Sequence, residues 1–262
     1  MKGLMIKDIM CLKKQLMVFC YVIIGVLIVS VMFVLSARFG NLAAAAQEMA
    51  AENSMSDMEV NNIATLALLL FMFLPFAVVG DVLFVFEEDS KAGFAKIAGA
   101  LPVSVPKRVL SRFLSIHALL GIGAVIDTVI AFGLSLLTDI VTFSDFMGMI
   151  LTSLSVMVIY SSVQIAYRVA MPGVGKGQYA QILSILTMVV GFVLIRFKKI
   201  KEIMTMIANG RAETEDMSVE RMWDLLTVIK EKAWIIGLIA LAVMLVSFAL
   251  SVTIAQRKRG VI

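Results

Sequence analysis

Charged side chains are scarce in this chain. Asp, Glu, Lys and Arg make up 16% of its 262 residues, against 61% hydrophobic residues. So little polar surface cannot cover a globule in water, which excludes a soluble domain and indicates an integral membrane protein. The net charge is +4, but the basic residues stand beside apolar runs instead of in stripes interleaved with aromatic residues. We therefore expect contact with membrane lipid and none with nucleic acid.

Cysteine and histidine are almost absent, which limits the chemistry that the chain can perform. Cys11 and Cys20 match neither a CxxC motif nor a disulfide framework. His117 is the only histidine and lies in an apolar run, so we expect a packed or hydrogen-bonded side chain and no metal site. The sequence has no Walker A or zinc-protease motif. It therefore predicts a chain that is not an enzyme and binds no cofactor of its own.

What the sequence has in abundance is long apolar runs, at residues 16–37, 63–86, 113–137, 146–167, 179–197 and 233–255. Each is close to the ~20 residues that a helix needs to cross ~30 Å of hydrocarbon. Lipid cannot satisfy backbone polar groups, so each span must be helical. The first run is too long for a signal peptide and precedes further spans, so we expect it to be uncleaved. The sequence predicts one all-α transmembrane domain over 1–262 with six spans.

Lys and Arg set the expected orientation. They concentrate at 1–15, 87–112, 168–178 and 256–262, which six spans place on one side. The positive-inside rule then predicts a multi-pass protein with both termini in the cytoplasm. The outer loop 198–232 carries charges of both signs and two short amphipathic patterns, which predict outer helices before the last span. Residues 1–15 predict an interfacial helix with a basic face, although a basic N-terminus that only sets topology is the alternative.

Asp127 stands near the middle of the third span. A charge there is costly, so the side chain should face the bundle interior, a cavity or a partner, or be protonated. Two interpretations stay open, namely a polar lining of a substrate path and a hydrogen bond that packs helices. Thr152 and Ser155 of the fourth span fit helix packing first, with the same substrate path as the alternative.

A charged segment separates the second and third spans, at 87–109. Acids at Glu87, Glu88 and Asp89 favour the start of a helix, and Leu101-Pro102 ends it. Lys107-Arg108 then marks the return to the membrane. A short helix parallel to the membrane would fit a partner's cleft, whereas the alternative is a charged loop that only fixes topology.

This segment resembles the corresponding one of the ABC-2 type permease family, particularly the small Gram-positive branch encoded beside a bacitracin-transport-like ATPase. The resemblance lies in Glu87-Glu88-Asp89, Gly93-Phe94, Leu101-Pro102-Val103-Ser104 and the run 107–114. The N-terminus, with Lys7-Asp8 and the run 13–16, is also similar, as is the connection 168–179.

The resemblance implies an ABC-2 (type V) exporter half in the plasma membrane of a Gram-positive bacterium. It would pair with a second permease copy and a dimer of cytoplasmic ATPase subunits, which bind ATP and Mg²⁺. The substrate would be amphipathic, an antimicrobial peptide or a lipid-like compound. The implied ATPase-coupling residues are Glu87, Glu88, Asp89, Lys91, Gly93, Phe94, Ile97, Leu101, Pro102, Lys107 and Arg108. Arg168 and Lys176 are candidates for a second ATPase contact, and Asp127, Thr152 and Ser155 for the substrate path. The alternative function is a non-transporting immunity or sensor subunit that binds a peptide or a kinase.

Overall fold

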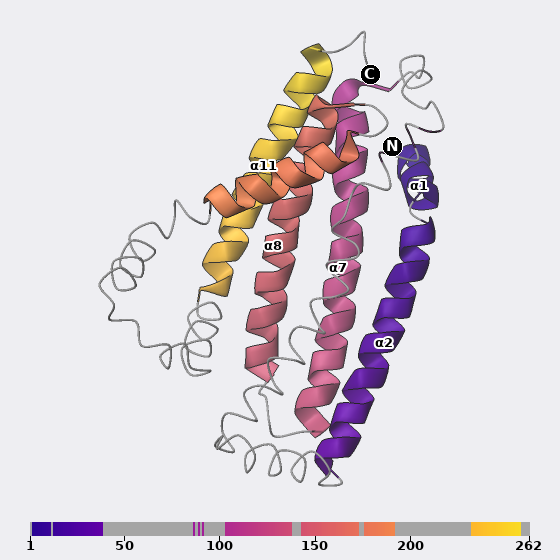
Figure 1. The fold of residues 1–262 in the computed structure, drawn as a ribbon, viewed down its shortest axis with the longest axis vertical. Helices are drawn as coiled ribbons and strands as arrows, with labels where there is room; N and C mark the ends of the chain where they lie inside the picture. Colours follow the sequence, from indigo (N-terminus) through magenta and orange to yellow (C-terminus); the bar gives the residue numbers. More distant parts are fainter. Residues whose placement is uncertain are drawn as a thin grey trace, which may run out of the picture.

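The computed structural model describes residues 2–11, 13–38, 86, 89, 91, 103–137, 143–172, 176–191 and 232–257. Its helices are α1 (Lys2–Cys11), α2 (Lys13–Arg38), α7 (Val105–Leu137), α8 (Phe143–Ala170) and α11 (Ala233–Arg257) (Figure 1). A further apolar helix, Gly177–Gly191, is orange in Figure 1. The described part of the chain contains no strand, in agreement with the all-α prediction.

Among the described residues, three helices are long and apolar enough to cross a membrane, at Val105–Leu136, Phe146–Ala170 and Ala233–Arg257. Leu16–Met32 and Gly177–Gly191 are shorter apolar helices. These features are those of an all-α membrane protein. Within the predicted second span, 63–86, only Phe86 is described, and within the outer loop 198–232 only Lys232 is. The number of six spans and the outer helices therefore stay predictions.

Two helix starts differ from the predicted ranges. The predicted interfacial helix 1–15 corresponds to α1, and α2 begins as a separate helix at Lys13. The helix α7 begins at Val105, before the predicted span 113–137. Ser104 precedes it, and its carbonyl accepts a 3.2 Å hydrogen bond from the Arg108 N–H. Pro106 suits the first turn, where no N–H donor is needed. Lys107 and Arg108 therefore belong to α7 itself.

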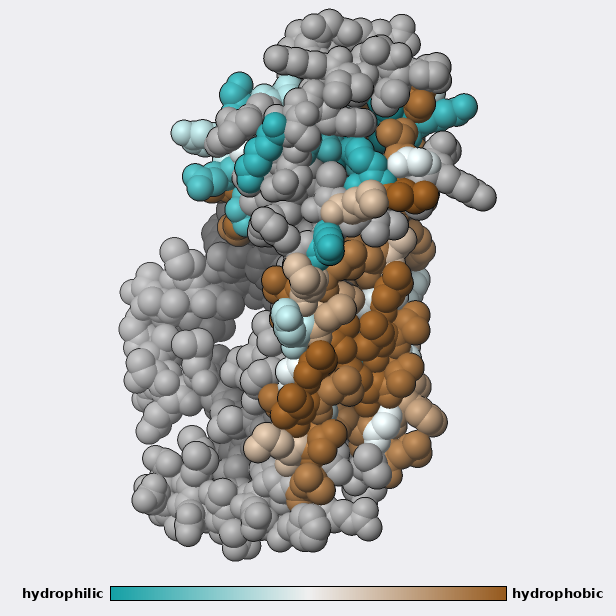
Figure 2. Space-filling model, turned by 90° about the vertical axis from the view of Figure 1, so that its right-hand side faces the viewer, coloured by the Kyte–Doolittle hydropathy of each residue, from teal (hydrophilic) through white to brown (hydrophobic). Residues whose placement is uncertain are grey.

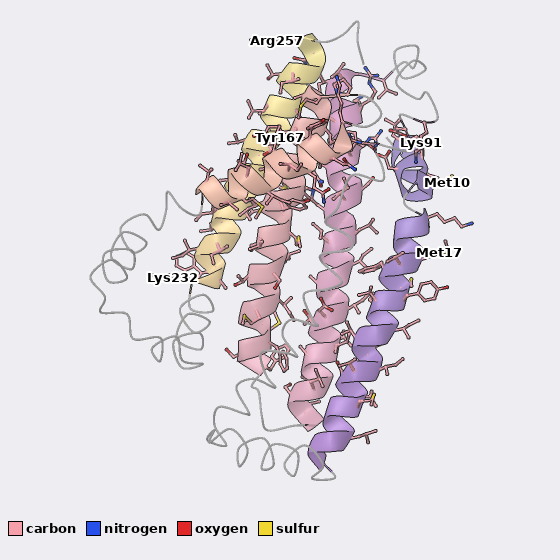
Figure 3. The ribbon with its side chains drawn as sticks, in the orientation of Figure 1. Met10, Met17, Lys91, Tyr167, Lys232 and Arg257 are labelled. Atoms are coloured by element: carbon pink, nitrogen blue, oxygen red, sulfur yellow. The ribbon has the colours of Figure 1, made fainter. Side chains whose placement is uncertain are left out.

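The helices α2 and α7 run from one end of the molecule, and α8 and α11 run back toward it (Figure 1). The short helix α1 lies at the same end as the last turn of α11. Figure 3 labels Met10, Lys91 and Arg257 there, whereas Lys232 lies well away from it. Hydrophilic residues gather at this end, and a broad hydrophobic surface lies beyond it (Figure 2). We call it the polar end.

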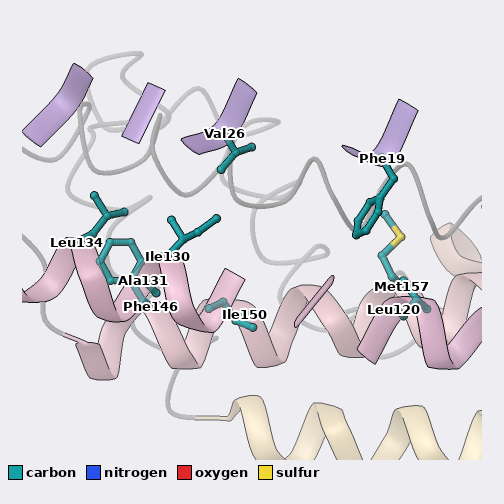
Figure 4. Close-up of a cluster of buried hydrophobic side chains, with 9 residues drawn as sticks. All are labelled: Phe19, Val26, Leu120, Ile130, Ala131, Leu134, Phe146, Ile150 and Met157. Carbon is teal, nitrogen blue, oxygen red and sulfur yellow. The ribbon is translucent and has the colours of Figure 1, made fainter. Parts of the chain in front are cut away.

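Two apolar clusters form the core. The first joins α2, α7 and α8 (Figure 4) and consists of Phe19, Val26, Leu120, Ile130, Ala131, Leu134, Phe146, Ile150 and Met157. The second lies nearer the polar end and consists of Val105, Val109, Phe113, Ile116, Ile165 and Ala255. There the ring of Phe113 meets that of Phe248 edge-on, with centroids 5.5 Å apart. The two clusters hold α7 between its neighbours along most of its length.

Small residues line the buried face of α11, namely Ala233, Ala240, Ser247, Ser251 and Ala255. Small side chains let membrane helices approach closely. A Cβ atom at Gly237 would lie 3.6 Å from the Ser155 Oγ, so α8 and α11 come close at this point. Large side chains such as Trp234 and Leu245 are exposed on α11 and suit contact with lipid.

Candidate coupling site at the polar end

Four charged side chains meet at the polar end, and we call them the ion-pair cluster: Lys7 and Asp8 of α1, Asp89, and Arg112 of α7. The Lys7 ammonium donates to both carboxylate oxygens of Asp89, at 2.8 and 2.9 Å. It also lies 2.9 Å from the Asp8 carboxylate. Lys7 therefore connects the N-terminal helix to the segment that follows the predicted second span.

Arg112 completes the cluster from the side of α7. Its Nη2 pairs with the Asp89 carboxylate, and its Nε lies 3.5 Å from an Asp8 oxygen. The neighbouring Ser111 hydroxyl donates to the other Asp8 oxygen at 3.2 Å. Both carboxylates are thus shared between Lys7 and Arg112. The arrangement joins α1, the Asp89 segment and α7 in a single set of contacts.

Phe86 extends this set of contacts toward α8. The Arg112 guanidinium lies over its ring at 5.0 Å from the centroid, and that of Arg168 at 5.5 Å. Arg168 is buried at the last turn of α8. Guanidinium groups attract aromatic faces at this range. The residue before the acidic run is therefore held between α7 and α8.

Burial decides how strongly the cluster constrains its helices. Asp8 is 1% exposed and Asp89 is 8% exposed. Two carboxylates and two cations balance one another, and removal of one member would leave a buried charge without compensation. Such removals from buried pairs typically cost about 3–5 kcal/mol. These buried contacts therefore tie α1, Asp89 and α7 together.

The structure places the predicted coupling residues in different surroundings. Asp89 is buried in the cluster, whereas Lys91, two residues later, is exposed, and both are helical. Lys107 is exposed and Arg108 half-buried in the first turns of α7. Of the second candidate contact, Arg168 is buried and Lys176 is exposed. The remaining predicted coupling residues lie outside the described residues: Glu87, Glu88, Gly93, Phe94, Ile97, Leu101 and Pro102.

Sequence reasoning missed the roles of Lys7, Asp8, Phe86, Ser111 and Arg112. The sequence indicates Lys7 and Arg112 as topology signals, Lys7 also as part of the basic face of an interfacial helix, and both stand in the segments that carry the family resemblance. One local signal was present, because Asp8 is the sole acid on an otherwise basic N-terminal helix. A carboxylate in that position suggests an intramolecular partner.

The candidate substrate-path residues differ in their bonding. The Thr152 hydroxyl donates to the Gly148 carbonyl at 2.8 Å, and the Ser155 hydroxyl to Leu151 at 2.6 Å. Asp127 is 0% exposed, and within the described part of the chain neither of its carboxylate oxygens has a hydrogen-bond partner. A charge at the bilayer centre costs ~2.5–3.5 kcal/mol on the lenient insertion scale. The Thr152 and Ser155 hydroxyls each donate a hydrogen bond within α8, whereas no described residue bonds to the Asp127 carboxylate.

His117 holds α7 against α8. Its Nδ1–H donates to the Phe113 carbonyl at 2.7 Å, and its Nε2 then accepts from the Ser162 hydroxyl at 3.1 Å. The side chain is hydrogen-bonded, as its place in an apolar run predicted. Among the described residues, no group of three or more His, Cys, Asp or Glu side chains has the arrangement of a metal site.

The long apolar helices with charges gathered at one end define an all-α integral membrane protein. A family model described as ABC-2 family transporter protein matches residues 53–258, most of the chain. The chain belongs to this family, which confirms the resemblance seen in the sequence. It is therefore a membrane component of an ABC transporter. Searches of curated proteins and of solved structures found no match.

Proposed function

We propose that this chain is the permease subunit of an ATP-driven exporter in the plasma membrane. A separate cytoplasmic ATPase dimer binds ATP and Mg²⁺, and a second permease copy completes the transmembrane pathway. The substrate is amphipathic, a peptide or a lipid-like compound. Membership of the ABC-2 transporter family supports the permease role. The ion-pair cluster supports a route by which a displacement of the coupling segment reaches the transmembrane helices.

The observation that carries the proposal is the pairing of Asp89 with both Lys7 and Arg112. Asp89 belongs to the segment that the sequence assigns to ATPase coupling. A displacement of this segment pulls on Arg112 directly, because their contact is an ion pair at a largely buried carboxylate. Since Arg112 lies in α7, the displacement reaches a helix that packs against both α2 and α8.

Two exposed cations suit the contact with the ATPase. Lys91 is exposed close to the buried Asp89, so this short segment has one side toward the protein and another toward solvent. Lys176 is exposed beyond the polar-end terminus of α8 and offers a second contact. Arg168 is buried and its guanidinium lies over the Phe86 ring, so it need not touch the ATPase. This division assigns docking to the exposed residues and transmission to the buried ones.

The polar end lies in the cytoplasm in this proposal. The first helix and the last described residue, Arg257, are both at that end, and the basic residues of α1 and α11 favour the inner face of the membrane (Figure 3). ATP binding favours one arrangement of the ATPase dimer over the other. That difference in binding free energy is what shifts the permease between its inward- and outward-open states.

The test is ATP-dependent transport by the assembled complex. We would purify the tagged chain from the membranes of its own cells and look for a stoichiometric ATPase. Inverted vesicles would then be assayed for uptake of a fluorescent amphipathic peptide. The control is an ATPase in which the Walker A lysine is replaced. ATP-dependent uptake only with the intact ATPase supports the proposal. Retention of a histidine kinase in place of an ATPase would instead support the sensor function.

A further inference from the structure

Asp127 is the buried acid that the coupling route does not use. It lies near the middle of the apolar part of α7 and shares a helix face with Leu120, Ala131 and Leu134, all buried. Its side chain is 0% exposed, and no described residue bonds to its carboxylate oxygens. The surroundings are the apolar cluster between α2, α7 and α8. Such a carboxyl group must either carry a proton or gain a cation.

Three hydroxyl groups of α7 and α8 donate within their own helices. The adjacent Thr128 hydroxyl donates to the Ala124 carbonyl of its own helix at 2.7 Å. The hydroxyls of Thr152 and Ser155 on α8 also donate within their own helix. These side chains therefore do not supply the donors that would make Asp127 a simple helix-packing residue.

Lys and Arg are absent from the middle of each predicted span. No Lys or Arg occurs between Arg38 and Lys91, between Arg112 and Arg168, between Lys176 and Arg196, or between Lys232 and Arg257. A second copy of the chain has the same cation-free runs. Asp8 and Asp89 differ in this respect, because each has Lys7 and Arg112 beside it. The described helices therefore place no Lys or Arg at the depth of Asp127, which leaves this role open to a cation from another molecule.

We propose that Asp127 binds the cationic head group of the exported substrate, an amphipathic molecule with a primary ammonium or guanidinium group. This inference rests on the proposed export function and specifies its substrate class. While the bundle encloses Asp127, its carboxyl group carries a proton. When the bundle opens, that proton passes to water and the carboxylate pairs with the substrate cation. Release of the substrate returns a proton to the carboxylate, so charge is conserved at each step.

The apolar residues around Asp127 suit the rest of such a substrate. Leu120 precedes Asp127 on α7 and Ile130 follows it, and Phe19 and Val26 contribute from α2 (Figure 4). An alkyl or aromatic tail gains hydrophobic contact with these side chains while the head group pairs with the carboxylate. A single charge in an apolar wall favours a cationic amphiphile over a neutral or anionic one.

The experiment uses two fluorescent probes that differ only in charge, a dansyl-labelled dodecylamine and its N-acetylated neutral analogue. Binding of each is measured by fluorescence titration to the purified permease–ATPase complex in nanodiscs without nucleotide. The variants are Asp127→Asn, which keeps the shape and removes the charge, and Asp127→Glu, which keeps the charge. Thr128→Ala is the matched control, because it removes a neighbouring polar group without changing charge.

We expect the wild-type complex to bind the amine at least tenfold more tightly than its acetylated analogue. Asp127→Asn should lose this preference, and Asp127→Glu and Thr128→Ala should keep it. Equal binding of the amine by wild type and Asp127→Asn would overturn the inference, as would equal binding of both probes by the wild type. Loss of binding of both probes in Asp127→Asn would assign the residue a structural role and also overturn it.

Transport distinguishes this inference from the proposed function. Charge-selective binding without ATP-dependent uptake would support the cation site and contradict the proposed export function. ATP-dependent uptake of both probes at equal rates would support the exporter and contradict the cation site.

Discussion

The Lys7 ammonium donates hydrogen bonds of 2.8 and 2.9 Å to the Asp89 carboxylate, across 82 residues of sequence. Asp89 is largely buried at this contact and is shared with Arg112. A helix that the sequence describes only as a membrane-surface anchor thus holds one end of the coupling segment. In the proposed function, force applied to that segment is resisted by α1 and transmitted to α7. The following predictions test this arrangement, the packing of α8 against α11, and the orientation of the polar end.

Lys7 and Asp89 should be energetically coupled. We expect Lys7→Met and Asp89→Asn each to lower the free energy of unfolding, and the double variant to lose less than the sum of the two. The coupling energy should be about 1–3 kcal/mol, as for contacting residues in one ion-pair network. Unfolding of the purified chain in mixed micelles measures it. Exposed Lys13 of α2 supplies the control variant Lys13→Met, whose effect should be within about 0.5 kcal/mol. Strictly additive effects of Lys7→Met and Asp89→Asn would contradict the shared contact.

Arg112 should be the most sensitive member of the cluster. Arg112→Met leaves Asp8 and Asp89 with Lys7 as the only cation of the cluster, and we expect a loss of about 3–5 kcal/mol in unfolding free energy. Arg112→Lys restores the charge but cannot pair with both carboxylates while lying over the Phe86 ring, so it should recover only part of that loss. Lys107→Met, at an exposed position of the same helix, is the control. Arg112→Lys that behaves as wild type would show that charge alone matters.

Gly237 should limit the size of side chain that fits between α8 and α11. An added Cβ would meet the Ser155 Oγ at 3.6 Å, an ordinary contact distance. Gly237→Ala should therefore be tolerated and, because alanine favours helix, change stability by less than about 1 kcal/mol. Gly237→Leu should force the helices apart and destabilise by about 1–3 kcal/mol. Leu238→Ala, at the exposed neighbouring position, serves as control in the same unfolding assay.

Lys91 and Lys232 should be accessible from opposite sides of the membrane. With Cys11 and Cys20 replaced by serine, a membrane-impermeant maleimide should label Lys232→Cys in intact cells. It should label Lys91→Cys only after permeabilisation, because Lys91 lies at the polar end and Lys232 away from it (Figure 3). Bound ATPase should then protect Lys91→Cys. Labelling of both positions in intact cells would contradict the cytoplasmic placement of the polar end.

The sequence was sufficient for the parts of the fold that depend on local pattern. The last helix was predicted at 233–255 and extends over Ala233–Arg257, because a continuous apolar run ends in basic residues. The start of α7 was placed later than it lies, since residues 105–112 are too polar for a span and yet helical. Ser104 and Pro106 carried the signal for the earlier start.

The ion-pair cluster could not be predicted in the same way. Its members are brought together by tertiary packing, as the Ser111–Asp8 hydrogen bond across 103 residues illustrates. Hydrophobic periodicity indicates which face of a helix is apolar, but it does not indicate which charges on separate helices meet. For the same reason the sequence leaves two interpretations of Asp127 open, and its burial without a described hydrogen-bond partner is the observation on which the proposed cation site rests.

The most direct test of the account is the number of substrate molecules transported per ATP hydrolysed by the purified permease–ATPase complex in proteoliposomes. We predict that Lys7→Met lowers this ratio severalfold while the ATPase remains bound and active, because Asp89 then pairs with Arg112 alone and α1 no longer holds the coupling segment. Lys13→Met should leave the ratio unchanged. A Lys7→Met complex that retains the wild-type ratio, with its ATPase bound, would contradict the claim that the ion-pair cluster transmits the motion.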